Sequence, residues 1–348
     1  MVSSRTSAAP AVPVAVAASL VLVMTTGALV IYKISGALKV LATARADHAL
    51  HAKTRWIDVT GASPAARPLL DSVNYLSWVG IALAFGIVIA AAVRALVPAR
   101  WLDRTVALEG MRGQVIAALI GAPLMLCSCC IAPVFETLYA RTRRLGPSLA
   151  VMLAAPALNP AVLAATFLIF PPAIGWLRLG AAVALVLFAS VALARVAPDP
   201  RPSESCALDA PSPSLRDLPR AFVASLGVVA KRTLPAIVIG IVVAMAVAGW
   251  VPLDRLAGTS AVLAVVAVAA IAVPLALPTF GEIPLALALV AAGAPLGAAA
   301  ALLIAGPTVN LPSLFALARS TSWRVAAATA GAVFAVAVAV GVLALAVI

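Results

Sequence analysis

Long apolar runs are the feature that most constrains this chain. A helix of roughly 20 apolar residues spans a hydrocarbon core of about 30 Å. Hydrophobic residues make up 64% of the 348 residues and charged residues only 10%, whereas soluble domains are about a quarter charged. The runs are Ala11–Tyr32, Val79–Val97, Leu145–Phe170, Leu179–Ala194, Leu234–Trp250, Ala261–Leu277, Leu296–Ala318 and Val325–Ile348. The sequence therefore predicts an all-α, multi-pass protein of the plasma membrane.

The basic residues fit a membrane protein better than a nucleic-acid binder. The formal net charge is +12, but the arginines lie in short loops between apolar runs, where the positive-inside rule places them. We therefore expect the lipid bilayer, and no nucleic acid, as a partner. The first run follows Arg5 and is longer than the apolar core of a signal peptide, which favours a transmembrane anchor.

Two polar stretches divide the chain. Residues 1–72 hold the N-terminal transmembrane helix and the polar loop Ser35–Asp71. Residues 197–219 are rich in proline and carry both signs of charge, which is typical of a linker. We predict that the remaining regions, 73–196 and 220–348, are the two repeats of a permease.

A constant offset of 151 residues relates the two regions. Matches of Pro, Gly and Asn carry more weight than matches of Leu and Ala, because the former are placed for backbone reasons. The matched pairs are Asp103-Arg104 with Asp254-Arg255, Pro123 with Pro274, Pro133 with Pro284, Gly146 with Gly297, Pro156 with Pro307 and Asn159 with Asn310. This regularity indicates an internal duplication.

The loop charges favour inverted halves over parallel halves. Short apolar pieces flank Cys127–Pro133 and Pro278–Pro284, and each pair could form one broken span or a hairpin that returns to the same face. With hairpins, most arginine-bearing loops fall on one side, and only Arg178 and Arg255 are basic on the other. We therefore predict two inverted repeats, each with three full helices and a re-entrant hairpin, plus the extra N-terminal transmembrane helix.

Four breaks in the apolar runs are candidates for a site near the membrane midplane. They are Cys127–Pro133, Pro156–Pro160, Pro278–Pro284 and Pro307–Pro312. Irregular backbone at this depth is tolerated where it lines a cavity or is buried in protein. The alternative is that the prolines only kink helices, without forming a site.

Particular residues in these breaks suit substrate binding. Pro133 and Pro284 fit the first turn of a helix, whose N-terminus would point free N–H groups at the site. Asn159 and Asn310 offer both donors and acceptors, although they could serve only to repair the opened backbone. Thr279, in the third break, is a further candidate.

The segment Cys127-Ser128-Cys129-Cys130 is the most specific chemical feature. Thiolates select soft centres such as Cu(I) and Zn, and trivalent arsenic, antimony and mercury species are thiophilic in the same sense. The three cysteines are therefore candidate ligands for a substrate or metal, with Ser128 beside them. Two alternatives remain: cysteines that act as small apolar residues, and a redox pair of the C-x-x-C type.

Two acidic residues lie in the same regions. Glu136 follows Pro133 by three residues, and Glu282 lies in the third break. An ionisable residue inside a membrane is a functional candidate by default, so either acid could carry a proton for coupled transport. For Glu136 the alternative is an ion pair with Arg143 or Arg144.

These motifs resemble the ArsP/YraQ-type permease family. The resemblance rests on Pro123–Pro133 with its Cys-Ser-Cys segment, on Leu145–Ser148, and on the Ala-Pro-x-x-Asn-Pro break at Ala155–Pro160. It covers roughly residues 75–348 and is weaker in the second half. The resemblance implies a secondary permease, since some members export trivalent organoarsenicals and others are linked to different soft metals. It also implies that Cys127 and Cys129 are the matched pair, with Cys130 as a departure.

The leading hypothesis is an ion-coupled efflux permease for a small thiophilic solute, with the proton as the expected coupling ion. The alternatives are a membrane thiol–disulfide oxidoreductase that uses Cys127 and Cys130, and an importer of a small anion in which the cysteines are incidental. No phosphate-binding loop of the G-x-x-x-x-G-K-[ST] type occurs, so we expect no ATP hydrolysis by this chain. We also expect neither an enzyme nor a bound cofactor. The exact substrate, the transport direction and the oligomeric state, including a homo-oligomer, stay open.

Overall fold

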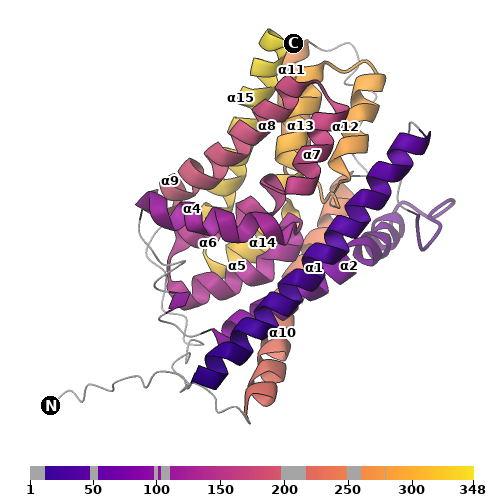
Figure 1. Ribbon diagram of the computed structural model, residues 1–348. Coiled ribbons are helices and arrows are strands. Elements are labelled where there is room, and N and C mark those ends of the chain that lie inside the picture. The colour runs from indigo at the N-terminus through magenta and orange to yellow at the C-terminus, as the bar shows by residue number, and fades with distance from the viewer. Residues whose placement is uncertain are drawn as a thin grey trace.

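The structure is a computed structural model that describes residues 12–47, 54–97, 101–102, 110–196, 217–248, 260–278 and 280–348. Every regular element in these residues is helical, and no strand occurs among them (Figure 1). The elements are α1 (Val12–Asp47), α2 (Arg67–Leu96), α4 (Gly110–Gly121), the 3-10 helix η1 (Ala122–Leu124), α5 (Ser128–Thr142), α6 (Leu145–Ala157), α7 (Pro160–Ile169), α8 (Pro172–Ala184), the π-helix η2 (Leu185–Ala189), α9 (Ser190–Val196), α10 (Leu218–Ala248), α11 (Ala261–Ala272), α12 (Glu282–Ala291), α13 (Leu296–Thr308), α14 (Leu311–Ser320) and α15 (Trp323–Val347). The all-α prediction is confirmed.

Several of these helices are long and apolar enough to cross a membrane. Five qualify singly within the described residues: most of α1, α2, the continuous α8–η2–α9 helix, α10 and α15. The pairs α6–α7 and α13–α14 also qualify, and they bend by 40° and 44° at their breaks. The chain is therefore a multi-pass membrane protein with five to seven candidate spans in its described part.

Asparagine and proline together explain both bends. After α6, the Asn159 side chain accepts hydrogen bonds from the N–H groups of Ala161 and Val162 at 3.1 and 3.4 Å. After α13, Asn310 accepts from the Ser313 N–H at 3.0 Å, and Ser313 Oγ accepts from the Asn310 N–H at 3.0 Å. A proline in the first turn needs no hydrogen-bond acceptor, and the asparagine satisfies the donors that follow. The sequence thus ends one helix and starts the next within a few residues.

The second helices of the two predicted hairpins, α5 and α12, begin at different positions relative to their prolines. The first of them, α5, starts at Ser128 with Cys127 as its N-cap, so Pro133 lies inside the helix and its predicted first-turn position is wrong. Having no N–H, Pro133 leaves the Cys129 carbonyl without its usual helical donor. The other, α12, starts at Glu282, and Pro284 lies in its first turn as predicted.

The N-terminal helix is longer than its apolar run. That run ends at Tyr32, but α1 continues to Asp47 through a segment rich in Ala, Leu and Lys, which favour helix. The beginning of the predicted polar loop is therefore helical. Residues 56 and 57 of that loop are held against α2, because Asn74 accepts from the N–H groups of Trp56 and Ile57 at 2.9 and 2.8 Å.

Helix boundaries recur at the 151-residue offset. The first residues of α2 and α10 are separated by this offset, as are those of α4 and α11, α6 and α13, α7 and α14, and α8 and α15. The exception is α12, which begins three residues later than the offset from α5 requires. The orientation of the two halves in the membrane stays a prediction, and most of the predicted linker, residues 197–216, lies outside the described residues.

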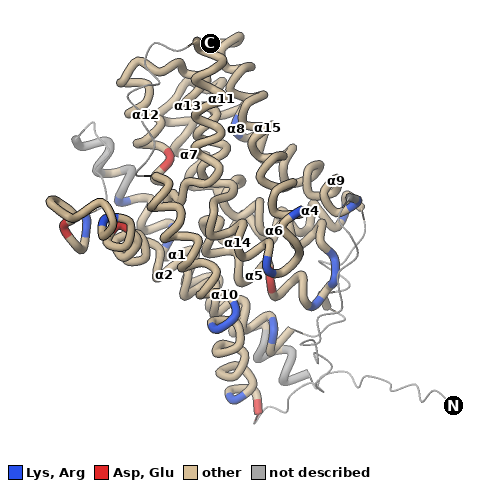
Figure 2. Tube along the Cα trace, turned by 180° about the vertical axis from the view of Figure 1, so that it is seen from behind, with Lys and Arg blue, Asp and Glu red and all other residues tan. Residues whose placement is uncertain are grey.

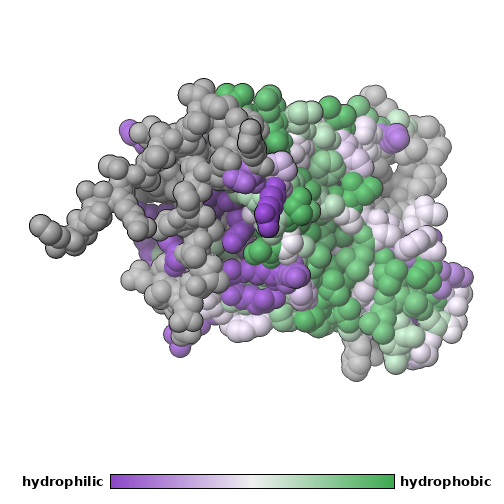
Figure 3. All heavy atoms as spheres, turned by 90° about the horizontal axis from the view of Figure 1, so that it is seen from below, coloured by the Kyte–Doolittle hydropathy of each residue, from purple (hydrophilic) through white to green (hydrophobic). Residues whose placement is uncertain are grey.

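Charged residues are unevenly distributed over the helices. Figure 2 shows lysines and arginines along α4, α5, α9 and α10, whereas α11 and α13 carry none. Seen from below, hydrophilic side chains gather on part of the surface, and broad apolar areas lie beside them (Figure 3). This is the pattern of a protein with a lipid-facing belt and polar ends.

Candidate substrate site

The three clustered cysteines lie at the buried start of α5. Cys127 is the N-cap, and Cys129 and Cys130 lie in the first turn with no exposed surface. The Cys127 Sγ atom lies 3.3 Å from Cys129 Sγ and 2.6 Å from Cys130 Sγ, and all three thiols are free. A set of three sulfur atoms within 4.8 Å of one another can hold a single soft ion or a thiophilic atom.

A close approach of two backbones holds this cluster in place. A Cβ atom on Gly86 of α2 would lie 2.1 Å from the Cys130 carbonyl oxygen. Only glycine therefore allows α2 to pack so tightly against the first turn of α5. The tight contact fixes where the cysteine side chains lie.

Tyr75 links the cluster to the other half of the chain. Its hydroxyl oxygen lies 3.6 Å from Cys129 Sγ and 3.4 Å from the carbonyl oxygen of Leu277, which precedes the third break. The side chain is 1% exposed, and a buried tyrosine hydroxyl requires such partners. Tyr75 was not among the predicted site residues, and its position in an apolar helix gave no signal of this contact.

A cavity lies where the four breaks meet. Its wall contains residues from each break. Its lining residues are Leu126, Cys127, Pro156, Asn159, Val162, Leu277, Pro278, Glu282 and Pro307. The structure thus brings Cys127, Asn159 and Glu282, three of the predicted site residues, to one small cavity.

The two asparagines differ in their relation to this cavity. Asn159 lines it, and its side-chain oxygen caps α7. Asn310 is fully buried as the cap of α14, its amide nitrogen has no hydrogen-bond partner, and it is absent from the lining. Both asparagines thus satisfy backbone donors at the breaks.

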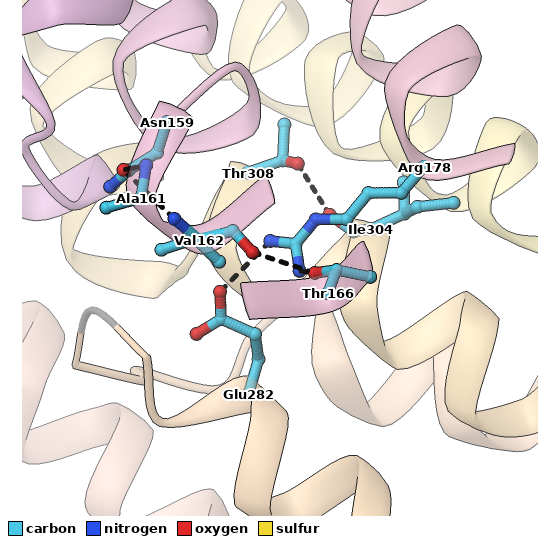
Figure 4. A network of polar contacts seen from close by, with 8 residues as sticks. All are labelled: Asn159, Ala161, Val162, Thr166, Arg178, Glu282, Ile304 and Thr308. Carbon is cyan, nitrogen blue, oxygen red and sulfur yellow. Dashed lines mark hydrogen bonds and ion pairs between the residues drawn. The ribbon is translucent and has the colours of Figure 1, made fainter. Parts of the chain in front are cut away.

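A buried ion pair lies beside the cavity (Figure 4). The Arg178 Nη2 atom of α8 lies 3.0 Å from Glu282 Oε1 of α12, and Arg178 Nη1 donates to Thr166 Oγ1 of α7 at 2.8 Å. The two charged side chains are 2% and 1% exposed. The prediction that Arg178 lies in a loop is wrong, because Arg178 lies inside α8; the signal was a single arginine within an otherwise apolar helix.

The other predicted acid lies away from the cavity lining. Glu136 is buried in α5, and its Oε2 atom accepts a hydrogen bond from Thr233 Oγ1 of α10 at 2.7 Å. This contact also joins the two halves. Glu136 therefore has a threonine as a hydrogen-bond partner.

The remaining predicted residues fall into two groups. Ser128 is buried, and its hydroxyl oxygen has no hydrogen-bond partner; Pro133 is buried in α5 and does not line the cavity. Thr279 lies outside the described residues. Unpartnered polar atoms on Ser128 and Glu282 are costly in a buried site, so both could still take a ligand.

Comparisons with known proteins give a family. The ArsP_1 family, described as predicted permeases, matches residues 66–345. The chain is also 29% identical over 265 residues to the UPF0718 protein YraQ of Escherichia coli (strain K12), a match that covers 74% of this chain and 75% of that protein. No solved structure is significantly similar to this chain.

Proposed function

Because this chain belongs to the ArsP_1 family of predicted permeases, we propose that it is a secondary-active permease that exports a small thiophilic solute. Trivalent organoarsenicals and soft metal species are the proposed substrates. The family supports a membrane transporter rather than an enzyme, and the nature of the substrate rests on the chain's own residues.

The observation that carries the proposal is the contact between the thiol cluster and the cavity. Cys127 belongs to both, so a solute in the cavity meets the first of three thiols. The remaining lining is largely apolar, and its polar groups are few. Such a site favours a small, weakly hydrated solute with a soft atom over a strongly hydrated ion.

Two features support a midplane site between inverted repeats. The breaks that line the cavity come in pairs at the same offset, Pro156 with Pro307 and Asn159 with Asn310, and the helix boundaries recur at that offset. The arginine-rich loop Arg141–Arg144 corresponds to uncharged residues in the second half. Equivalent loops that face opposite compartments would differ in this way.

The two buried acids are the proposed proton carriers. Glu282 lines the cavity, whereas Glu136 lies between α5 and α10. Each joins the two halves through its side chain. A carboxyl group in such a place can couple proton movement to a change in how the halves pack.

A resistance assay tests the substrate class. Cells that express the wild-type chain should tolerate methylarsenite or a soft metal better than cells with Cys127→Ser or Cys129→Ser. Cys206→Ser is the matched control, because this cysteine lies far from the cluster in the sequence, and it should behave as wild type. Equal tolerance of all four strains across a panel of thiophilic toxicants would sink the proposal.

One distance favours a second function, a thiol–disulfide oxidoreductase. Cys127 and Cys130 form a C-x-x-C pair with Sγ atoms 2.6 Å apart at the start of a helix, a setting in which thiols become reactive. In this reaction the two thiols would lose two electrons and two protons to a disulfide acceptor. Trapping thiols in oxidised and reduced membranes should then show a mobility shift that Cys130→Ser abolishes; thiols that stay reduced throughout exclude it.

A further inference from the structure

The ion pair of Arg178 and Glu282 is the feature that the proposed function leaves least explained. Its partners are 104 residues apart in sequence and come from α8 in the first half and α12 in the second. In Figure 4 the guanidinium group lies between Thr166 and the Glu282 carboxylate. Nothing in the comparisons assigns a role to Arg178.

Burial makes this pair expensive. Both side chains are almost fully removed from solvent, and taking two charges out of water costs more than a well-packed apolar pair of similar size. In a membrane segment, where ionisable residues are rare, such a pair marks a functional position rather than a contribution to stability. The pair therefore needs an explanation other than holding the fold together.

The helix that carries Glu282, α12, makes few other contacts with the rest of the protein. Within the described residues, α12 packs extensively only against α13 of its own half, whereas α5 packs against α2, α6, α10 and α14. The ion pair is thus a principal contact between α12 and the first half. Any motion that separates α12 from α8 must break it.

Glu282 is also open to the cavity on its other side. Its Oε2 atom has no hydrogen-bond partner, and the residue lines the cavity together with Cys127. Arg178 and the Cys127 thiol are the ionisable groups that the described residues place around it, since neither α13 nor the rest of α12 carries one. A proton that enters the cavity can therefore reach Oε2 without displacing another partner.

We propose that Arg178 and Glu282 form a latch between the two halves, which opens when Glu282 takes up a proton from the cavity. Glu282 is then the coupling carboxylate, and Arg178 is the positioning residue that holds it while it is charged. Arg178 keeps its own proton throughout, and the proton on Glu282 leaves to the other compartment before the pair forms again. The proposal rests on the proposed permease function, because a latch of this kind couples a proton to a transported solute.

The alkylation rate of Cys127 tests the latch without any substrate. Glu282→Gln mimics the protonated acid and leaves the Arg178 charge buried without its partner, which strongly destabilises the closed arrangement. At constant pH this variant should therefore make Cys127 react about tenfold faster or more with a water-soluble maleimide. Peptide mass spectrometry assigns the reaction to Cys127. The matched control is Thr329→Val, which removes a buried polar group of α15 away from the cavity lining and should leave the rate unchanged.

A double variant without either charge provides a second test in case Glu282→Gln fails to fold. Arg178→Gln combined with Glu282→Gln removes both charges and leaves neither one buried alone. This double variant should also expose Cys127. If Cys127 reacts at the wild-type rate in both the single and the double variant, the latch is overturned.

Transport in proteoliposomes separates the latch from the proposed function. The double variant should move methylarsenite down its own gradient but lose the response to an imposed pH gradient that the wild type shows. A double variant that still responds, or a wild type that ignores the pH gradient, would overturn the latch and leave the permease standing. A wild type that moves neither methylarsenite nor a soft metal would instead defeat the permease, and the alkylation rates alone would then decide the latch.

Discussion

The α4–α5 pair and the α11–α12 pair occupy equivalent places in the sequence but are held in different ways. The first is packed tightly against α2, α10 and α14 and carries the thiols at the start of α5. The second has fewer neighbours and is joined to the other half through the Arg178–Glu282 pair. In the proposed mechanism, the more constrained pair binds the solute and the less constrained pair responds to the proton.

The largest effect is expected when Arg178 is removed, because the α11–α12 pair then loses its ion pair with the other half. Arg178→Met leaves a buried carboxylate without its partner, and we expect about 3–5 kcal/mol lower stability. The control is Thr329→Val in α15, the position that corresponds to Arg178 at the 151-residue offset and is fully buried; it should cost about 1 kcal/mol. Thermal unfolding in detergent measures both, and equal losses would contradict the special role of the pair.

The tight packing of the first pair can be broken at one glycine. In Gly86→Ala the added methyl group would meet the Cys130 carbonyl oxygen at 2.1 Å, and overpacking of this kind costs about 1–3 kcal/mol. We also expect lower toxicant resistance, because the cysteines must shift. Gly80→Ala in the same helix meets nothing within 4 Å and should keep wild-type stability and resistance; if it fails as badly, the close contact is not the cause.

The two asparagines sharpen the comparison further. Serine also caps helices well, so Asn159→Ser and Asn310→Ser should each change stability by less than about 1 kcal/mol. Only Asn159 lines the cavity, and we expect transport to fall in Asn159→Ser but not in Asn310→Ser. A resistance assay beside a melting curve separates the two effects, and equal transport in both variants would reduce Asn159 to a cap.

The smallest effect on transport is expected at the link between the two pairs. Tyr75→Phe removes the hydroxyl group that lies near Cys129 Sγ and the Leu277 carbonyl oxygen, at a cost of about 0.5–1.5 kcal/mol. Because the ring still fills its site, the fold should persist. Faster alkylation of Cys129 in this variant would show that the hydroxyl shields the thiol, and an unchanged rate would remove Tyr75 from the site.

Much of the fold could be predicted because its signals are local. The apolar runs gave the spans, and the bends at Asn159 and Asn310 followed from an asparagine cap beside proline. Local signals also misled. Proline is favoured in the first turn of a helix, but α5 begins five residues before Pro133. The first turn of α5 also packs tightly against Gly86 of α2, a contact that no local pattern encodes.

The site was predicted in part for the same reason. The thiols, Asn159 and Glu282 stand out by residue type, and the structure brings them to one cavity. The partner of Glu282, Arg178, lies 104 residues away in the sequence. It was missed because Arg178 was predicted to lie in a loop. Pairings between distant helices depend on how the halves pack, which a single sequence does not specify.

The ion pair also has an electrical consequence. While Glu282 is charged, the pair is neutral, but a proton on Glu282 leaves one positive charge within the membrane. Each elementary charge that crosses the full membrane potential changes energy by about 2.3 kcal/mol per 100 mV. If the halves move one way while Glu282 is protonated and return while it is charged, one positive charge moves within the membrane in one direction only. The rate of the transport cycle would then depend on the membrane voltage as well as on the pH difference.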